Sequence, residues 1–123
     1  MDQKVILIID DDCNNVTAVK EVLEKAGFSV RYAHTAEEGL QRIKEKTPDL
    51  ILLDLVLPDE SGFKACHQIK EISETKDTPI IAISLKTEEI DKHIAAKCGI
   101  ADYLEKPLNY QKLIYTIKNL LEG

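Results

Sequence analysis

The feature that most limits the fold of this chain is a short apolar run, residues 49–53, that stops at Asp54 and leads into a turn segment ending at Gly62. A nearly continuous apolar run of this length is typical of a strand buried on both faces of a parallel sheet. Burying an isolated carboxylate is costly, so an acid at the end of such a strand is expected where solvent, a metal or a partner can satisfy it. The run therefore predicts that Asp54 lies at the carboxyl end of a central strand, where open α/β sheets bind ligands.

The rest of the chain alternates between two apolar patterns. Runs typical of strands occupy residues 5–9, 28–33, 49–53, 79–83 and 100–104. Helical spacing follows each run and predicts helices from about residue 14, after Thr35, over about 61–73, after Thr87 and from about Asn109. Alternating strands and helices predict parallel βαβ units with helices on both faces. The expected fold class is α/β, a single doubly wound five-stranded parallel sheet in the order 2-1-3-4-5, the flavodoxin-like (βα)5 arrangement.

Helix boundaries carry their own signals. Gly27 is a natural stop for the first helix, Thr35 and Glu38 form a capping box for the second, and Ser61 is a plausible N-cap for the third. The helix expected after Thr87 and before Gly99 presents a set of apolar residues that we expect to face inward, namely Ile90, Ile94 and Ala95.

Length and composition predict a single domain spanning residues 1–123. The net charge of −6 disfavours binding to nucleic acid or to anionic lipid. No apolar run approaches the roughly 20 residues of a membrane span, and no signal peptide is visible. Three cysteines at unrelated spacings argue against a disulfide framework or a zinc site. We therefore expect a cytoplasmic protein without membrane contact.

Polar residues follow four of the five expected strands. In a parallel sheet the carboxyl ends of all strands lie at one edge, which brings together Asp10, Asp11, Asp54, Ser84 and Lys106. Three carboxylates so close need raised pKa values or a compensating cation. Hard oxygen ligands of this kind suit Mg²⁺. With an ammonium and a hydroxyl beside the metal, the arrangement predicts a phosphoryl site in which Asp54 is the nucleophile.

These residues carry a family resemblance. The segments Ile9-Asp10-Asp11, Leu53-Asp54-Leu55-Val56-Leu57-Pro58 with Gly62, Ile83-Ser84 and Lys106-Pro107 resemble the receiver domain of two-component response regulators, in the manner of chemotaxis regulators. The likeness covers essentially the whole chain. The spacings of 30 residues from Asp54 to Ser84 and 52 to Lys106 match the family pattern.

The resemblance implies a phosphorelay function with Mg²⁺ (or Mn²⁺) as cofactor. Asp54 would accept a phosphoryl group from a phosphohistidine on a sensor histidine kinase or a histidine phosphotransfer protein. Asp11, Asp54 and the backbone carbonyl of Val56 would ligate the metal directly, and Asp10 would act mainly through a metal-bound water. The domain would catalyse only its own phosphorylation and slow dephosphorylation, so it would not be an enzyme in the usual sense.

The resemblance also implies a switch. Ser84 would hydrogen-bond the phosphoryl group and Lys106 would pair with it. Movement of Ser84 would be coupled to an inward swing of Tyr103, which would remodel the face made by the fourth helix, fifth strand and fifth helix and be read by a downstream protein. Since no further module follows residue 123 in this sequence, we expect output through protein contacts and no direct binding of nucleic acid, unless the chain is a fragment of a longer one.

Three positions modulate this scheme, and alternatives remain open. Val56 and Lys86 occupy positions that tune the lifetime of the phosphorylated state in the family, and Leu85 stands where a small residue is usual. Leu85 favours one alternative, a receiver-like interaction module that does not depend on phosphate. A flavodoxin-like cofactor binder or a haloacid-dehalogenase-type phosphatase is a third, opposed by the lack of a phosphate-binding loop and of a second acid two residues after Asp54.

Overall fold

The computed structural model describes residues 3–85 and 92–122. In this part of the chain one parallel sheet has five strands in the order β2-β1-β3-β4-β5. The strands are β1 (Val5–Ile9), β2 (Ser29–Ala33), β3 (Leu50–Asp54), β4 (Ile80–Ser84) and β5 (Ile100–Glu105). The predicted α/β class and strand order are confirmed. Relative to the predicted range 49–53, β3 begins one residue later, at Leu50, and includes Asp54 itself.

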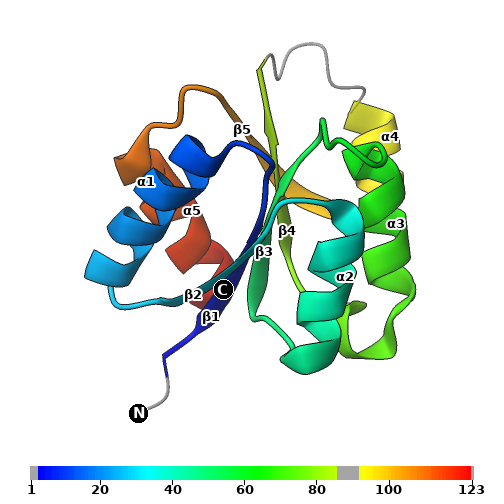
Figure 1. Ribbon diagram of the computed structural model, residues 1–123, viewed down its shortest axis with the longest axis horizontal. Helices are drawn as coiled ribbons and strands as arrows, with labels where there is room; N and C mark the ends of the chain where they lie inside the picture. The colour runs from blue at the N-terminus through cyan, green and yellow to red at the C-terminus, as the bar shows by residue number, and fades with distance from the viewer. Residues whose placement is uncertain (1–2, 86–91, 123) are drawn as a thin grey trace.

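Helices cover both faces of the sheet (Figure 1). The helices are α1 (Cys13–Lys25), α2 (Ala36–Glu45), α3 (Gly62–Glu71), the short 3-10 helix η1 (Ser73–Thr75), α4 (Lys92–Lys97) and α5 (Tyr110–Glu122). In Figure 1, α1 and α5 lie on one face, and α2, α3 and α4 lie on the other. This sandwich explains why β1 and β3 are buried along their whole length and read as continuous apolar runs.

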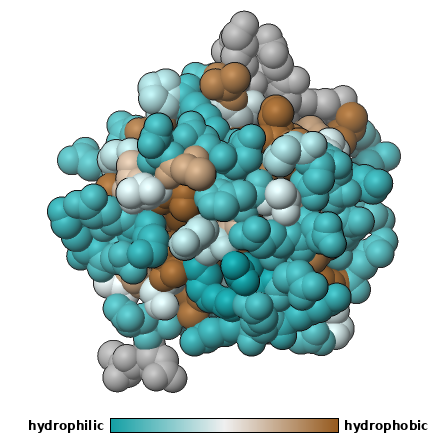
Figure 2. All heavy atoms as spheres, viewed as in Figure 1, coloured by the Kyte–Doolittle hydropathy of each residue, from teal (hydrophilic) through white to brown (hydrophobic). Residues whose placement is uncertain are grey.

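The core is divided by the sheet into two main apolar clusters. Ile6, Ile8 and Leu52 pack with residues of α1 and α5, whereas Leu7, Ile51 and Leu53 pack with residues of α2 and α3. Successive strand residues point to opposite faces, so each strand serves both clusters. The outer surface seen in Figure 2 is mainly hydrophilic, with apolar residues in small separate groups.

The predicted N-caps of α2 and α3 and the glycine stop of α1 are confirmed, whereas α3 ends at Glu71 rather than near residue 73. The Thr35 hydroxyl accepts a hydrogen bond from the Glu38 N–H, and Ser61 accepts from the Lys64 N–H. Gly27, with a φ of 97°, follows α1 in the left-handed region that glycine adopts readily. These local signals fix where the chain turns back toward the sheet.

The prediction for the fourth helix was partly wrong. Ala95 is buried as expected, but Ile94 is 46% exposed. The described part of α4 has six residues, and Ala95 joins Leu55 and Ala82 in a small cluster. Ile94 and Ala95 are consecutive, so in a helix their side chains point about 100° apart, and the Ala95 side lies against the cluster. The predicted cap Thr87, together with Ile90, lies outside the described residues.

Candidate functional site

Asp54 is the last residue of β3 and lies beside Ile83 of β4 in the sheet. Its side chain is buried, with 5% of the residue exposed. One carboxylate oxygen, Oδ1, accepts a hydrogen bond from the Val56 N–H at 2.8 Å, and Oδ2 accepts from Lys106 Nζ at 2.8 Å. Both oxygens are therefore held in place, which is what a buried carboxylate at the end of a central strand requires.

Asp10, directly after β1, is completely buried. Its Oδ1 accepts a hydrogen bond from the Asp12 N–H at 2.9 Å, and its Oδ2 accepts from Asn15 Nδ2 at 2.6 Å. Lys106 Nζ lies 3.5 Å from the same Oδ2. Lys106 thus contacts both Asp10 and Asp54. Asn15, on the first turn of α1, also belongs to the site, although it was not predicted from the sequence.

Asp11 completes the acidic cluster. Carboxylate oxygens of Asp10, Asp11 and Asp54 lie within 4.8 Å of one another. Asp11 is exposed, whereas the other two acids are buried, so the cluster is open to solvent on the Asp11 side. Asp12 has a different role, because its carboxylate accepts from the Asn14 and Asn15 N–H groups and caps α1.

The cluster carries more negative charge than the ammonium of Lys106 neutralises. Burial raises the pKa of Asp54, and the nearby charge of Asp10 acts in the same direction. Partial burial acts to lower the pKa of Lys106, but the hydrogen bond to Asp54 and the charge of Asp10 outweigh it and raise that pKa. Three oxygen-bearing acids with excess negative charge fit a hard divalent cation such as Mg²⁺ or Mn²⁺.

The loop between β3 and α3 is folded back against the end of β3. Val56 and Ser61 form an isolated antiparallel bridge, and the Gly62 N–H donates to the Leu55 carbonyl at 2.9 Å. A Cβ at position 62 would lie 2.5 Å from Leu55 Cα and 2.7 Å from the Asp54 carbonyl oxygen. Only glycine permits this close approach, so Gly62 closes the loop beside the site.

A cavity of about 490 Å³ opens above the cluster. The residues that line it are Asp11, Asp12, Asp54, Val56, Ser84, Leu85 and Lys106. Val56 and Leu85 are 74% and 73% exposed, so two apolar side chains flank the entrance to Asp54. Lys86, the third modulating position, lies outside the described residues.

β4 and β5 bring the remaining predicted residues to this edge. Ser84 ends β4, and its carbonyl accepts a hydrogen bond from the Lys106 N–H at 2.7 Å. Tyr103 of β5 is half-buried and packs against the small cluster of Leu55, Ala82 and Ala95. Tyr103 pairs with Ala82 in the sheet, so it packs against a cluster that also contains Leu55, the residue after Asp54.

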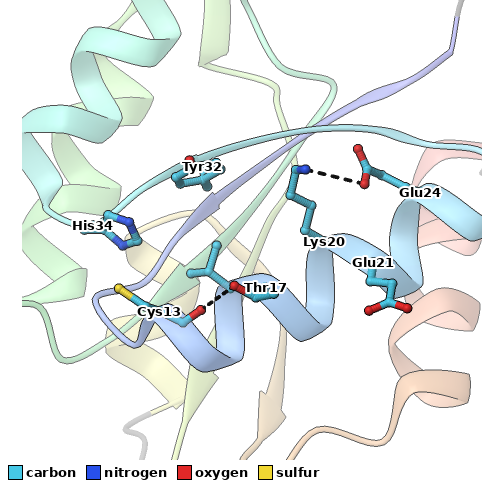
Figure 3. Close-up of a pocket in the computed structure, with 8 residues that line it drawn as sticks. Cys13, Thr17, Lys20, Glu21, Glu24, Tyr32 and His34 are labelled. Carbon is cyan, nitrogen blue, oxygen red and sulfur yellow. Dashed lines mark hydrogen bonds and ion pairs between the residues drawn. The ribbon is translucent and has the colours of Figure 1, made fainter.

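A second groove, of about 440 Å³, lies between α1 and β2 (Figure 3). Within α1, Thr17 donates to the Cys13 carbonyl at 2.9 Å, and Lys20 pairs with Glu24 at 3.5 Å. From the other side of the groove, His34 Nδ1 lies 3.1 Å from the backbone carbonyl oxygen of Asp10.

Comparison with known proteins identifies the family. The sequence model described as the response regulator receiver domain matches residues 6–118, which is nearly the whole chain. The chain belongs to this family. Receiver domains are the signalling domains of two-component systems, and they interact with histidine kinases or phosphotransfer proteins and bind Mg²⁺ in an acidic pocket. None of the helices described here is long and apolar enough to cross a membrane.

Individual relatives agree with this family. Protein PilH of Pseudomonas aeruginosa is 35% identical over 96% of this chain and 98% of its own length. The transcriptional regulatory protein CpxR of Klebsiella pneumoniae is 34% identical, and this chain spans 48% of that protein. A crystal structure of a two-component response regulator from Clostridium difficile is 35% identical with a TM-score of 0.90, covering 98% of this chain and 97% of the other. Receiver domains of this kind thus occur both nearly alone and within longer regulators.

Proposed function

We propose that this receiver domain, residues 1–123, accepts a phosphoryl group on Asp54 from the phosphohistidine of a sensor histidine kinase or a histidine phosphotransfer protein. The observation that carries the proposal is the 2.8 Å contact of Lys106 Nζ with Asp54 inside a cluster of three acids at one sheet edge. A nucleophilic carboxylate, a fixed ammonium and an open cavity are the parts that phosphoryl transfer requires.

Four residues would hold the metal ion. Asp11 and Asp54 would bind Mg²⁺ or Mn²⁺ directly with the backbone carbonyl of Val56, and Asp10 would act through a metal-bound water, as the family resemblance implies. The close spacing of the three carboxylates supports this set. When bound, the metal would neutralise the acids and the incoming phosphoryl oxygens.

The side chains of this chain account for the transfer itself. An oxygen of Asp54 forms a bond to phosphorus while the phosphorus–nitrogen bond of the donor histidine breaks and its electron pair returns to the imidazole. Lys106, already beside Asp54, stabilises the charge on the phosphoryl oxygens, and the Ser84 hydroxyl donates a hydrogen bond to one of them. Water later hydrolyses the acyl phosphate, so the domain turns over only its own phosphoryl group.

Phosphorylation would act as a switch through Ser84 and Tyr103. The packing of Tyr103 against the cluster of Leu55, Ala82 and Ala95 supports a link between the end of β3 and α4. A change at Ser84 would bias two packings of this region, and a downstream protein would read the face formed by α4, β5 and α5. A cytoplasmic location and output through protein contacts, without direct binding of nucleic acid, complete this proposal.

Leu85 favours a second candidate function. Its exposed side chain lines the cavity beside Asp54, together with Val56. An apolar entrance of this kind would slow access of a phosphodonor or of water to Asp54. Lys86, the other modulating position, follows Leu85 in the sequence. If access were fully blocked, the chain would be an interaction module that does not depend on phosphate.

Incubation with a small phosphodonor tests the choice between the two functions. The native chain and Asp54→Ala are treated with acetyl phosphate, with Mg²⁺ and with a chelator, and followed by intact mass. We expect one phosphoryl group on the native chain, only with Mg²⁺, and none on Asp54→Ala. If the native chain stays unmodified but Leu85→Ala becomes labelled, the interaction module is the better account.

A further inference from the structure

Asp59 connects two segments that are distant in sequence. It lies in the loop between β3 and α3, and its carboxylate reaches the start of α2. Oδ1 accepts a hydrogen bond from the Ala36 N–H at 3.0 Å, and Oδ2 accepts from the Glu37 N–H at 3.1 Å. One carboxylate therefore binds two of the free N–H groups at the N-terminus of α2.

This contact is additional to the helix's own cap. Thr35 already serves α2 by accepting from the Glu38 N–H at 3.0 Å. The hydrogen bond from the Ala36 N–H, and that from Glu37, lower the pKa of Asp59, so the carboxylate is charged at neutral pH. Asp59 thus joins the loop to α2 by two charge-assisted hydrogen bonds, which are stronger than neutral ones.

Besides the Asp59 contact, the loop is held by buried apolar side chains and by hydrogen bonds at its two ends. Leu57 is buried in the core beside α2 and α3, but the Val56 side chain is 74% exposed and holds nothing in place. The Val56 N–H donates to Asp54 at the end of β3, and the Gly62 N–H donates to the Leu55 carbonyl where the loop closes. The Asp59 contact with α2 holds the loop between these two points.

We propose that Asp59 is a positioning residue for the metal site: by fixing the β3–α3 loop against α2, it preorganises the backbone carbonyl of Val56 as a ligand. This inference rests on the proposed function, because it concerns the metal of the same site. An anchored loop has already lost the conformational freedom that metal binding would otherwise remove. The affinity for the metal ion is therefore higher than it would be with a loose loop. Asp59 itself does not bind the metal.

The test compares Asp59→Ala with two matched variants. Thr35→Ala removes the other cap of α2 without touching the loop, and Glu60→Gln removes one negative charge from the adjacent residue. Mg²⁺ affinity is measured by isothermal titration calorimetry. We expect Asp59→Ala to weaken Mg²⁺ binding about tenfold, the scale of residues that support metal ligands, while both control variants bind like the native chain.

Hydrogen exchange of the metal-free protein gives a second readout. Amides of residues 55–61 are expected to exchange faster in Asp59→Ala than in the native chain, and at the native rate in Thr35→Ala. Asp59→Asn keeps the shape of the side chain and one acceptor oxygen, so we expect its amides to exchange at a rate between those of the native chain and Asp59→Ala. This variant replaces Asp59→Ala in the test if Asp59→Ala does not fold. Unfolding followed by circular dichroism verifies that each variant is folded.

The outcomes separate this inference from the proposed function. Equal weakening in Asp59→Ala and Thr35→Ala shows that Asp59 only caps α2, and equal weakening in Glu60→Gln shows a general effect of charge; either result overturns the inference. Normal Mg²⁺ binding by Asp59→Ala overturns it too and leaves the proposed function intact. Absence of Mg²⁺ binding by the native chain contradicts the proposed metal site and, with it, this role of Asp59.

Discussion

At the residue scale, acids of the same type have different roles according to their hydrogen-bond partners. Asp10, Asp11 and Asp54 could be selected from the sequence because each follows a continuous apolar run. Asn15 and Asp59 could not. Asn15 interacts with Asp10 across a helix start, and Asp59 with a helix 22 to 23 residues earlier, and no periodicity or strand end marks either contact.

Asn15 provides a direct prediction about the buried acid. Asn15→Ala removes the 2.6 Å hydrogen bond to Asp10 and leaves a fully buried carboxylate with one donor fewer. We expect the free energy of unfolding of the metal-free protein to fall by about 1 to 3 kcal/mol, measured by urea titration. Asn14→Ala, on the same turn, is the control. Equal stability of Asn15→Ala and the native chain would contradict this role.

At the element scale, continuous and periodic patterns were sufficient for the strands and for the caps of α2 and α3. The sequence pattern did not predict the exposure of Ile94, because helical spacing shows which residues share a face but not how much of that face is buried. The course of the β3–α3 loop could not be predicted from the sequence either, since it depends on tertiary contacts of Gly62 and Asp59.

Gly62→Ala tests the closure of that loop. The added Cβ would lie 2.5 Å from Leu55 Cα, and a backbone atom cannot move aside as a flexible side chain can. We expect the free energy of unfolding to fall by about 1 to 3 kcal/mol and Mg²⁺ binding to weaken, as measured by urea titration and calorimetry. Gly39→Ala is an informative comparison because its close neighbour is the Ile9 side chain. A Gly62→Ala variant as stable as the native chain would be inconsistent with the observed loop.

The contact of Asp59 with α2 predicts a dependence of stability on pH. Hydrogen bonds from the start of α2 lower the pKa of Asp59 in the folded state, so its contribution is present above the unfolded-state pKa of about 4 and is lost as pH falls through the folded-state value. The difference in unfolding free energy between the native chain and Asp59→Asn should be constant from neutral pH to mildly acidic pH and shrink below about 4. Urea titrations across this range measure it. A difference that stays constant to the lowest pH would contradict the assignment.

At the scale of the whole molecule, parallel topology determines where the chemistry lies. Every strand ends at the same edge, and the strand order 2-1-3-4-5 makes β1 and β3 neighbours, so Asp10, Asp11 and Asp54 meet. This part of the site could be predicted from the sequence because it follows from topology alone. A net charge of −6 adds to the preference of this edge for a cation.

The most direct test is to locate the phosphoryl group on the native chain. After reaction with Mg²⁺ and a phosphodonor, borohydride reduces an aspartyl phosphate to homoserine, and peptide mass spectrometry locates the modified residue. We expect homoserine at position 54 and at no other acid of the cluster, and no homoserine when Mg²⁺ is chelated. Modification at Asp10 or Asp11, or none in the presence of Mg²⁺, would contradict it.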